Sequence, residues 1–156
     1  MYRSIRLLIV SALIVLPGAG IAGERFDGKW DTTLTCPDKG KTSGYTWKFL
    51  STIMDGVLHG ERGTAGQPGS FALDGKVGDD GAAKLTGNGI VMSRQYARGV
   101  FAAKGEDYSY NVKVQFKEAT GSGVRDEGLG IVGRPCTFEF AKQTGGSQPA
   151  GGSAAR

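Results

Sequence analysis

The chain has 156 residues, with 19 lysines and arginines against 15 aspartates and glutamates, and a formal net charge of +4. The basic residues are scattered, without a run of about five or more like charges, so nucleic acid is not an expected partner. Glycine contributes 27 residues, which indicates frequent turns and short strands.

Residues 1–22 have the anatomy of a secretory signal peptide. Arg3 and Arg6 precede an apolar run over residues 7–16, and small residues lead to a cleavage site near Ala22–Gly23. A retained membrane anchor would need roughly 18 apolar residues, and this run is about half that length. We therefore expect cleavage, a periplasmic or secreted location, and no membrane contact afterwards.

The rest of the chain is predicted to be one domain followed by a tail. Residues 23–142 are long enough to build a single hydrophobic core. Residues 143–156 are rich in glycine, serine and alanine, so we expect them to form a disordered extension. Nothing in the composition demands association, and a monomer is expected.

Alternating apolar and polar residues predict short β-strands along the whole domain. The pattern is clearest over residues 29–36, where Trp30, Leu34 and Cys36 share one face, and over residues 108–117. Other strands are expected at 44–54, 56–62, 70–77, 82–91, 121–127 and 136–140. Asp-Gly pairs at 27–28, 55–56, 74–75 and 80–81 are typical of tight hairpin turns.

The two cysteines indicate how the strands are arranged. Cys36 ends the first predicted strand and Cys136 begins the last, both on the apolar side, and export favours a disulfide between them. First and last strands can be antiparallel neighbours in an up-and-down meander only if the strand number is even. Residues 93–104 alternate poorly, so we interpret them as a loop or short helix over one barrel mouth, although a further strand there would make nine. The predicted fold is therefore all-β, a closed eight-stranded barrel, with a two-sheet β-sandwich as the alternative.

Gly28-Lys29-Trp30 forms a G-x-W step at the start of the first strand and resembles the calycin barrels, which include lipocalins and avidins. This resemblance implies that Trp30 packs across the barrel floor under a basic side chain from the last strand, and Arg134 is the position expected to supply it. More widely, residues 26–37, 55–60, 66–69 and 134–136 resemble an uncharacterised family of bacterial secreted domains. That resemblance implies no function.

Aromatic residues on the inward-facing positions are the main candidates for a binding site. They either fill the barrel or line a pocket, because buried tyrosine hydroxyls and indole nitrogens need polar partners. The candidate ligand-binding residues are Trp30, Tyr45, Trp47, Tyr96, Tyr108, Tyr110 and Arg134. Arg94 and Arg98 belong to the loop predicted over the mouth, together with Tyr96.

Other motifs give no site. His59 is the only histidine, which makes a zinc centre improbable, and no cofactor is expected. Residues 35–42 imitate the end of a phosphate-binding loop, and residues 128–133 fit G-x-G-x-x-G. Neither is followed by the helix that such motifs require, so both are interpreted as turns.

These observations favour an exported, non-enzymatic binding or interaction module. It would hold a small ligand in the barrel or contact a protein through its rim loops. One alternative is a periplasmic protease inhibitor of the calycin type, although only residues 23–26 precede the first strand and could act as an inserting trunk. A less favoured alternative is an enzyme that uses His59 and Glu61 for proton transfer.

Overall fold

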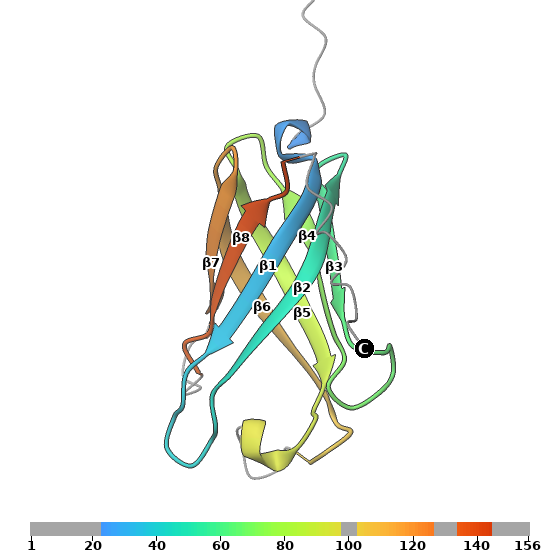
Figure 1. The fold of residues 1–156 in the computed structure, drawn as a ribbon, viewed down its shortest axis with the longest axis vertical. Helices are drawn as coiled ribbons and strands as arrows, with labels where there is room; N and C mark the ends of the chain where they lie inside the picture. The colour runs from blue at the N-terminus through green and yellow to red at the C-terminus, as the bar shows by residue number, and fades with distance from the viewer. Residues whose placement is uncertain (1–22, 98–102, 127–133, 145–156) are drawn as a thin grey trace, which may run out of the picture.

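The computed structural model describes residues 23–97, 103–126 and 134–144, and its strands form one closed antiparallel barrel (Figure 1). Neighbours in sequence are neighbours in space around the whole barrel. The strands are β1 (Gly28–Cys36), β2 (Tyr45–Met54), β3 (Val57–Arg62), β4 (Phe71–Val77), β5 (Ala82–Ile90), β6 (Asp107–Phe116), β7 (Thr120–Asp126) and β8 (Thr137–Lys142). The predicted eight-stranded up-and-down barrel is confirmed, and the sandwich alternative is wrong.

Closure occurs where β1 pairs with β8. The register places Thr32 opposite Phe140 and Leu34 opposite Phe138, so inward-facing residues of both strands meet in the core. The predicted disulfide joins Cys36 to Cys136 at the end of this seam. Because every strand has two neighbours, the sheet presents no free edge to another chain.

Turn chemistry agrees with the sequence at the β2–β3 hairpin and departs from it in β4. Asp55 and Gly56 both have positive φ, 52° and 70°, as a tight two-residue turn between paired Met54 and Val57 requires. The pair at 74–75 is not a turn. It lies inside β4, where Gly75 sits so close to the β5 backbone that a Cβ would fall 2.6 Å from the Lys84 carbonyl oxygen.

The two ends of the barrel differ. Short turns join the strands at the end where β1 begins, and a 3-10 helix, η1 (Glu24–Phe26), packs there with Phe26 fully buried (Figure 1). Trp30 lies beneath it and donates its Nε1 hydrogen to the Phe26 carbonyl oxygen at 2.9 Å. Residues 23–26 thus cap the closed end, an arrangement unlike the free trunk that the inhibitor alternative requires.

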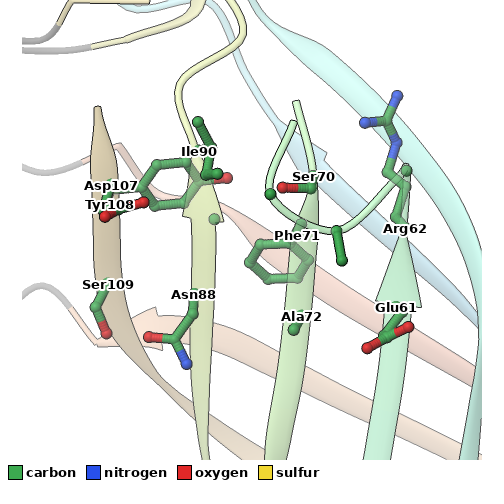
Figure 2. Close-up of a pocket in the computed structure, with 14 residues that line it drawn as sticks. Glu61, Arg62, Ser70, Phe71, Ala72, Asn88, Ile90, Asp107, Tyr108 and Ser109 are labelled. Atoms are coloured by element: carbon green, nitrogen blue, oxygen red, sulfur yellow. The ribbon is translucent and has the colours of Figure 1, made fainter. Parts of the chain in front are cut away.

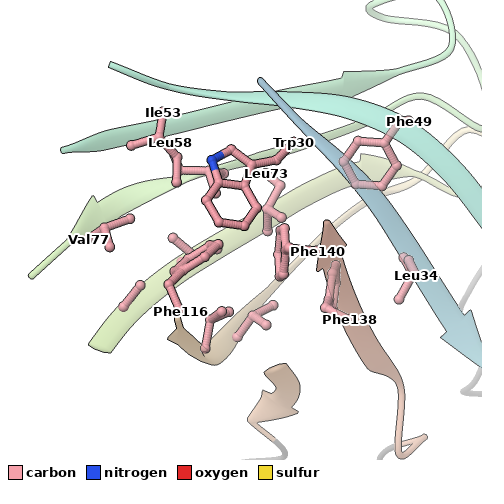
Figure 3. Packing of buried hydrophobic residues seen from close by; sticks show 14 of the residues in the cluster. Trp30, Leu34, Phe49, Ile53, Leu58, Leu73, Val77, Phe116, Phe138 and Phe140 are labelled. Atoms are coloured by element: carbon pink, nitrogen blue, oxygen red, sulfur yellow. The ribbon is translucent and has the colours of Figure 1, made fainter. Parts of the chain in front are cut away.

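Apolar side chains fill the closed half. Trp30 packs edge-on against Phe116, with ring centroids 5.1 Å apart, and Phe116 in turn contacts Phe140 at 5.0 Å. Figure 3 shows this cluster together with Ile53 of β2, Leu58 of β3, and Leu73 and Val77 of β4. The opposite end of the barrel, at Cys36, is its mouth. The connections after β1, β3, β5 and β7 lie there and are longer than the turns at the closed end.

The segment after β5 includes a second 3-10 helix, η2 (Arg94–Tyr96), as expected for a loop or short helix. The backbone amide of Ser43 donates to the Gln95 carbonyl oxygen at 2.7 Å, which ties η2 to the β1–β2 connection. Arg98, the predicted signal peptide and tail residues 145–156 lie outside the described residues, so those predictions stay as they are. No helix within the described ranges is long and apolar enough to span a bilayer.

Candidate functional site

A cavity of about 140 Å³ opens at the mouth of the barrel, above the apolar core. Strands β2, β5, β6 and β7 form its walls. Tyr96 of η2 covers one side, together with Met92, Ser93 and Ala97, which flank η2 in the chain. Its described lining residues are Tyr45, Trp47, Ile90, Val91, Met92, Ser93, Tyr96, Ala97, Tyr108, Tyr110, Arg125 and Arg134. Six of the seven predicted ligand-binding residues are among them: the four strand aromatics Tyr45, Trp47, Tyr108 and Tyr110, the loop residue Tyr96, and Arg134.

The aromatic walls come from two strands on either side of the cavity. Tyr45 and Trp47 alternate inward on β2, with ring centroids 4.5 Å apart. Tyr108 and Tyr110 do the same on β6, and their rings are stacked at 6.0 Å with only 3° between the planes. Tyr96 of η2 meets Tyr45 edge-on at 6.0 Å, so η2 completes the aromatic lining.

Each of three arginines at this mouth lies over a different aromatic ring. The guanidinium carbon of Arg62 is 4.1 Å from the Trp47 ring, that of Arg125 is 4.3 Å from Tyr110, and that of Arg134 is 5.4 Å from Tyr45. Such cation–π contacts hold the positive groups against the aromatic faces. Arg134 is only 2% exposed.

Arg62 and Arg125 were missed by the sequence analysis, although a signal for them exists. Arg62 continues the inward series of Leu58 and Gly60 on β3. Arg125 follows buried Gly123 with the same spacing on β7. Both are the last inward-facing positions of their strands, so strict alternation would have placed them at the mouth.

The hydroxyls of Tyr45, Tyr108 and Tyr110 remain protonated at neutral pH, because the pKa of each is raised. Burial raises the pKa of Tyr108 and Tyr110 well above the usual 10.0. Burial also raises the pKa of Tyr45, against the opposing charges of Arg134, Arg125 and Arg62. The side chain of Tyr110 is 9% exposed, and its hydroxyl makes no hydrogen bond to any residue that the structure describes. A buried hydroxyl without such a bond is costly unless something else satisfies it.

The cavity is electrically one-sided. Arg125 and Arg134 both line it, and no aspartate or glutamate occurs among its described lining residues. Ser93 adds a second buried hydroxyl that makes no hydrogen bond within the described chain. Basic side chains and neutral tyrosine hydroxyls thus line the site around its aromatic faces.

Comparisons with protein-family models, with curated proteins and with solved structures each found no match to this chain. The calycin and bacterial-family resemblances thus stay predictions.

Trp30 and Arg134 do not have the relation that the calycin resemblance implied. Trp30 is fully buried in the closed half and is the one candidate residue that does not line the cavity, whereas Trp47 and Tyr110 both line the cavity and belong to the buried cluster. The basic group over its ring is Lys142 of β8, with Nζ 5.7 Å from the centroid. Arg134 was the wrong choice because it precedes β8, which begins at the mouth and ends at the floor.

A larger hollow of about 590 Å³ lies on the outer face of β3 to β6 beside the β3–β4 connection. Figure 2 shows Glu61, Ala72, Asn88 and Ser109 in a row across the four strands, as their pairing requires. The polar side chains of this row are solvent-exposed. The hollow therefore contains no buried polar group that calls for a ligand.

The residues of the enzyme alternative also lie on the outer face, and Glu61 is one of the residues that line this hollow. His59 Nε2 is 3.3 Å from Glu61 Oε1, and His59 Nδ1 is 2.6 Å from Asp74 Oδ1. The predicted shared face of His59 and Glu61 is thus confirmed, with Asp74 as an addition from β4. These side chains are more than 45% exposed. No group of three or more potential metal ligands occurs in the described ranges.

Proposed function

We propose that this protein is an exported binding module that holds one small molecule in the cavity at the barrel mouth. The observation that carries the proposal is the buried Tyr110 hydroxyl at the cavity wall, which makes no hydrogen bond to the described chain. A barrel of eight strands is wide enough either to be filled by side chains or to hold one small ligand. In this chain the closed half is filled, whereas the mouth half is lined by polar aromatic groups.

The size of the cavity limits the ligand. Its volume of about 140 Å³ is similar to the roughly 150 Å³ of an engineered protein cavity that binds benzene. We therefore expect a ligand built on one ring or of comparable size. Aromatic faces with a few polar groups are typical of small-molecule sites.

The compartment proposal rests on two features. The disulfide between Cys36 and Cys136 lies at the mouth, beside the cavity. Disulfides of this kind persist in the periplasm and outside the cell. Together with the predicted signal peptide, this supports a periplasmic or secreted binding protein.

Blocking the cavity tests the proposal. Wild-type protein is titrated with benzene, phenol, benzamide and benzoate, and amide shifts of residues around the mouth are followed by NMR. We expect at least one compound to saturate these shifts. Ala97→Phe, which places a ring in the cavity from a residue outside the barrel strands, should abolish the response.

Ala82→Phe is the matched control, because Ala82 is exposed at the other end of the barrel. It should bind like the wild type. Absence of saturable shifts for all four compounds up to about 1 mM, a Kd that corresponds to a binding free energy of about −4 kcal/mol, would overturn the proposal. If a folded Ala97→Phe variant binds the compounds as tightly as the wild type, the binding site is not this cavity and the proposal is wrong.

A further inference from the structure

We infer that the mouth cavity selects a planar anion, a one-ring aromatic carboxylate, over neutral and cationic molecules of the same shape. This inference rests on the proposed function and adds the chemical class of the ligand. It is carried by the sign of the charged groups around the cavity and by the orientation of the aromatic groups.

The charges at the mouth favour an anion. Arg125 and Arg134 line the cavity, and Arg62 lies on the Trp47 ring that forms part of the same wall. No described lining residue is acidic. A positive charge at the cavity wall attracts a negative guest and opposes a positive one, and Arg125 supplies such a charge.

Hydrogen-bonding capacity points the same way. A guanidinium group only donates, and its planar fork matches the two oxygens of a carboxylate. The high pKa values of Tyr108 and Tyr110 keep their hydroxyl hydrogens available as donors. A carboxylate accepts several donors at once, so it can accept a hydrogen bond from the Tyr110 hydroxyl while it faces Arg125.

The walls favour a flat ring. Tyr45 and Trp47 face the cavity from β2, and the stacked Tyr108 and Tyr110 face it from β6. Offset and edge-to-face contacts with such rings stabilise an aromatic guest beyond the area that it buries. An aromatic cage for a cation would use the same rings, but Arg62 and Arg125 already lie over Trp47 and Tyr110 and would repel a further positive charge.

The test compares four probes on the full mature protein by calorimetry. Benzoate and benzamide have nearly the same shape and differ in charge, benzylammonium reverses the charge, and acetate lacks the ring. We expect benzoate to bind at least about tenfold more tightly than benzamide, as a charge-assisted hydrogen bond allows. Acetate should bind more weakly than benzoate, and benzylammonium should not bind.

Arg125→Gln should reduce the ratio of the benzamide Kd to the benzoate Kd, because it removes one lining charge while keeping a polar side chain. Tyr110→Phe should weaken benzoate binding by removing the hydroxyl. Lys113→Gln is the control, since Lys113 is exposed on the outer face of β6, where it pairs with Asp126. This control variant should leave the ratio of the two Kd values unchanged.

The outcomes separate the two proposals. If benzamide or benzylammonium binds as tightly as benzoate, the anion inference is overturned and small-molecule binding stands. If no probe binds, both proposals fail. An unchanged ratio in folded Arg125→Gln, or binding of acetate equal to that of benzoate, would also contradict the inferred ligand class.

Discussion

His59, on the outer face of β3, lies between two carboxylates. Its Nδ1 is 2.6 Å from Asp74 and its Nε2 is 3.3 Å from Glu61. The hydrogen bond with Asp74 is the main reason that the His59 pKa is raised above 6.5, with smaller contributions from the charge of Asp74 and from Glu61. Alternation along β3 predicted the Glu61 contact, whereas Asp74 became a neighbour only through the register that pairs it with His59.

The histidine pKa gives a prediction at the residue scale. In wild-type protein the His59 ring should titrate above 6.5, and Asp74→Asn should lower its pKa more than Glu61→Gln does. Because the folded pKa exceeds the unfolded one, the stabilisation is complete below the unfolded value and is lost as pH rises through the folded value. NMR titration of the ring protons measures the pKa of each variant.

The imidazole is 56% exposed, so water screens the interaction and the effect on overall stability should be small. Lys113→Gln, which changes a charge on β6, is the control and should leave the His59 pKa in place. A His59 pKa that is the same in wild type and Asp74→Asn would contradict the prediction.

Glycines in the strands decide how closely the elements pack around the cavity. Gly87 of β5 faces inward between Phe71 of β4 and Tyr110 of β6. A Cβ at Gly87 would lie 2.8 Å from the Phe71 ring and 3.0 Å from the Tyr110 ring. These rings are stacked with centroids 5.9 Å apart, so the glycine leaves the space in which they meet.

Gly87→Ala is therefore expected to destabilise the barrel. Overpacking of this kind costs about 1 to 3 kcal/mol, because the rings or the backbone must move. Urea unfolding followed by tryptophan fluorescence measures the change. Asn88→Ala alters the adjacent exposed position and should shift the free energy of unfolding by no more than about 0.5 kcal/mol. Equal stability of Gly87→Ala and wild type would show that the two rings can separate freely.

At the scale of the whole molecule, the β1–β8 seam and the disulfide close the barrel. The two cysteines are 100 residues apart in sequence and join the end of β1 to the start of β8. A cross-link over so long a loop reduces the entropy of the unfolded chain more than a short one does. The same bond fixes the position of the chain just before β8, which carries Arg134 into the mouth.

Replacing both cysteines by alanine should lower the free energy of unfolding by about 4 to 5 kcal/mol, the loop-closure value for a loop of this length. Urea unfolding of the double variant and of reduced wild type should agree, because both lack the same cross-link. A loss of unfolding free energy below about 1 kcal/mol would contradict this prediction. It would mean that the β1–β8 pairing keeps the barrel closed with little help from the disulfide.

The sequence by itself determined most of the strands and indicated the cysteine pair, because a period of two is a local and countable property, whereas the structure decided for eight strands in a closed barrel over nine strands or a sandwich. Alternation also identified the inward aromatic residues. It could not tell that Trp30 lies at the floor while Tyr45 and Trp47 lie at the mouth as one wall of a cavity, since height in a barrel depends on strand direction and stagger. Only the tertiary structure placed Lys142, rather than Arg134, over Trp30 and brought three arginines to the mouth. Those residues come from β3, β7, β8 and the segment before β8, and their meeting is decided by register rather than by spacing along the chain.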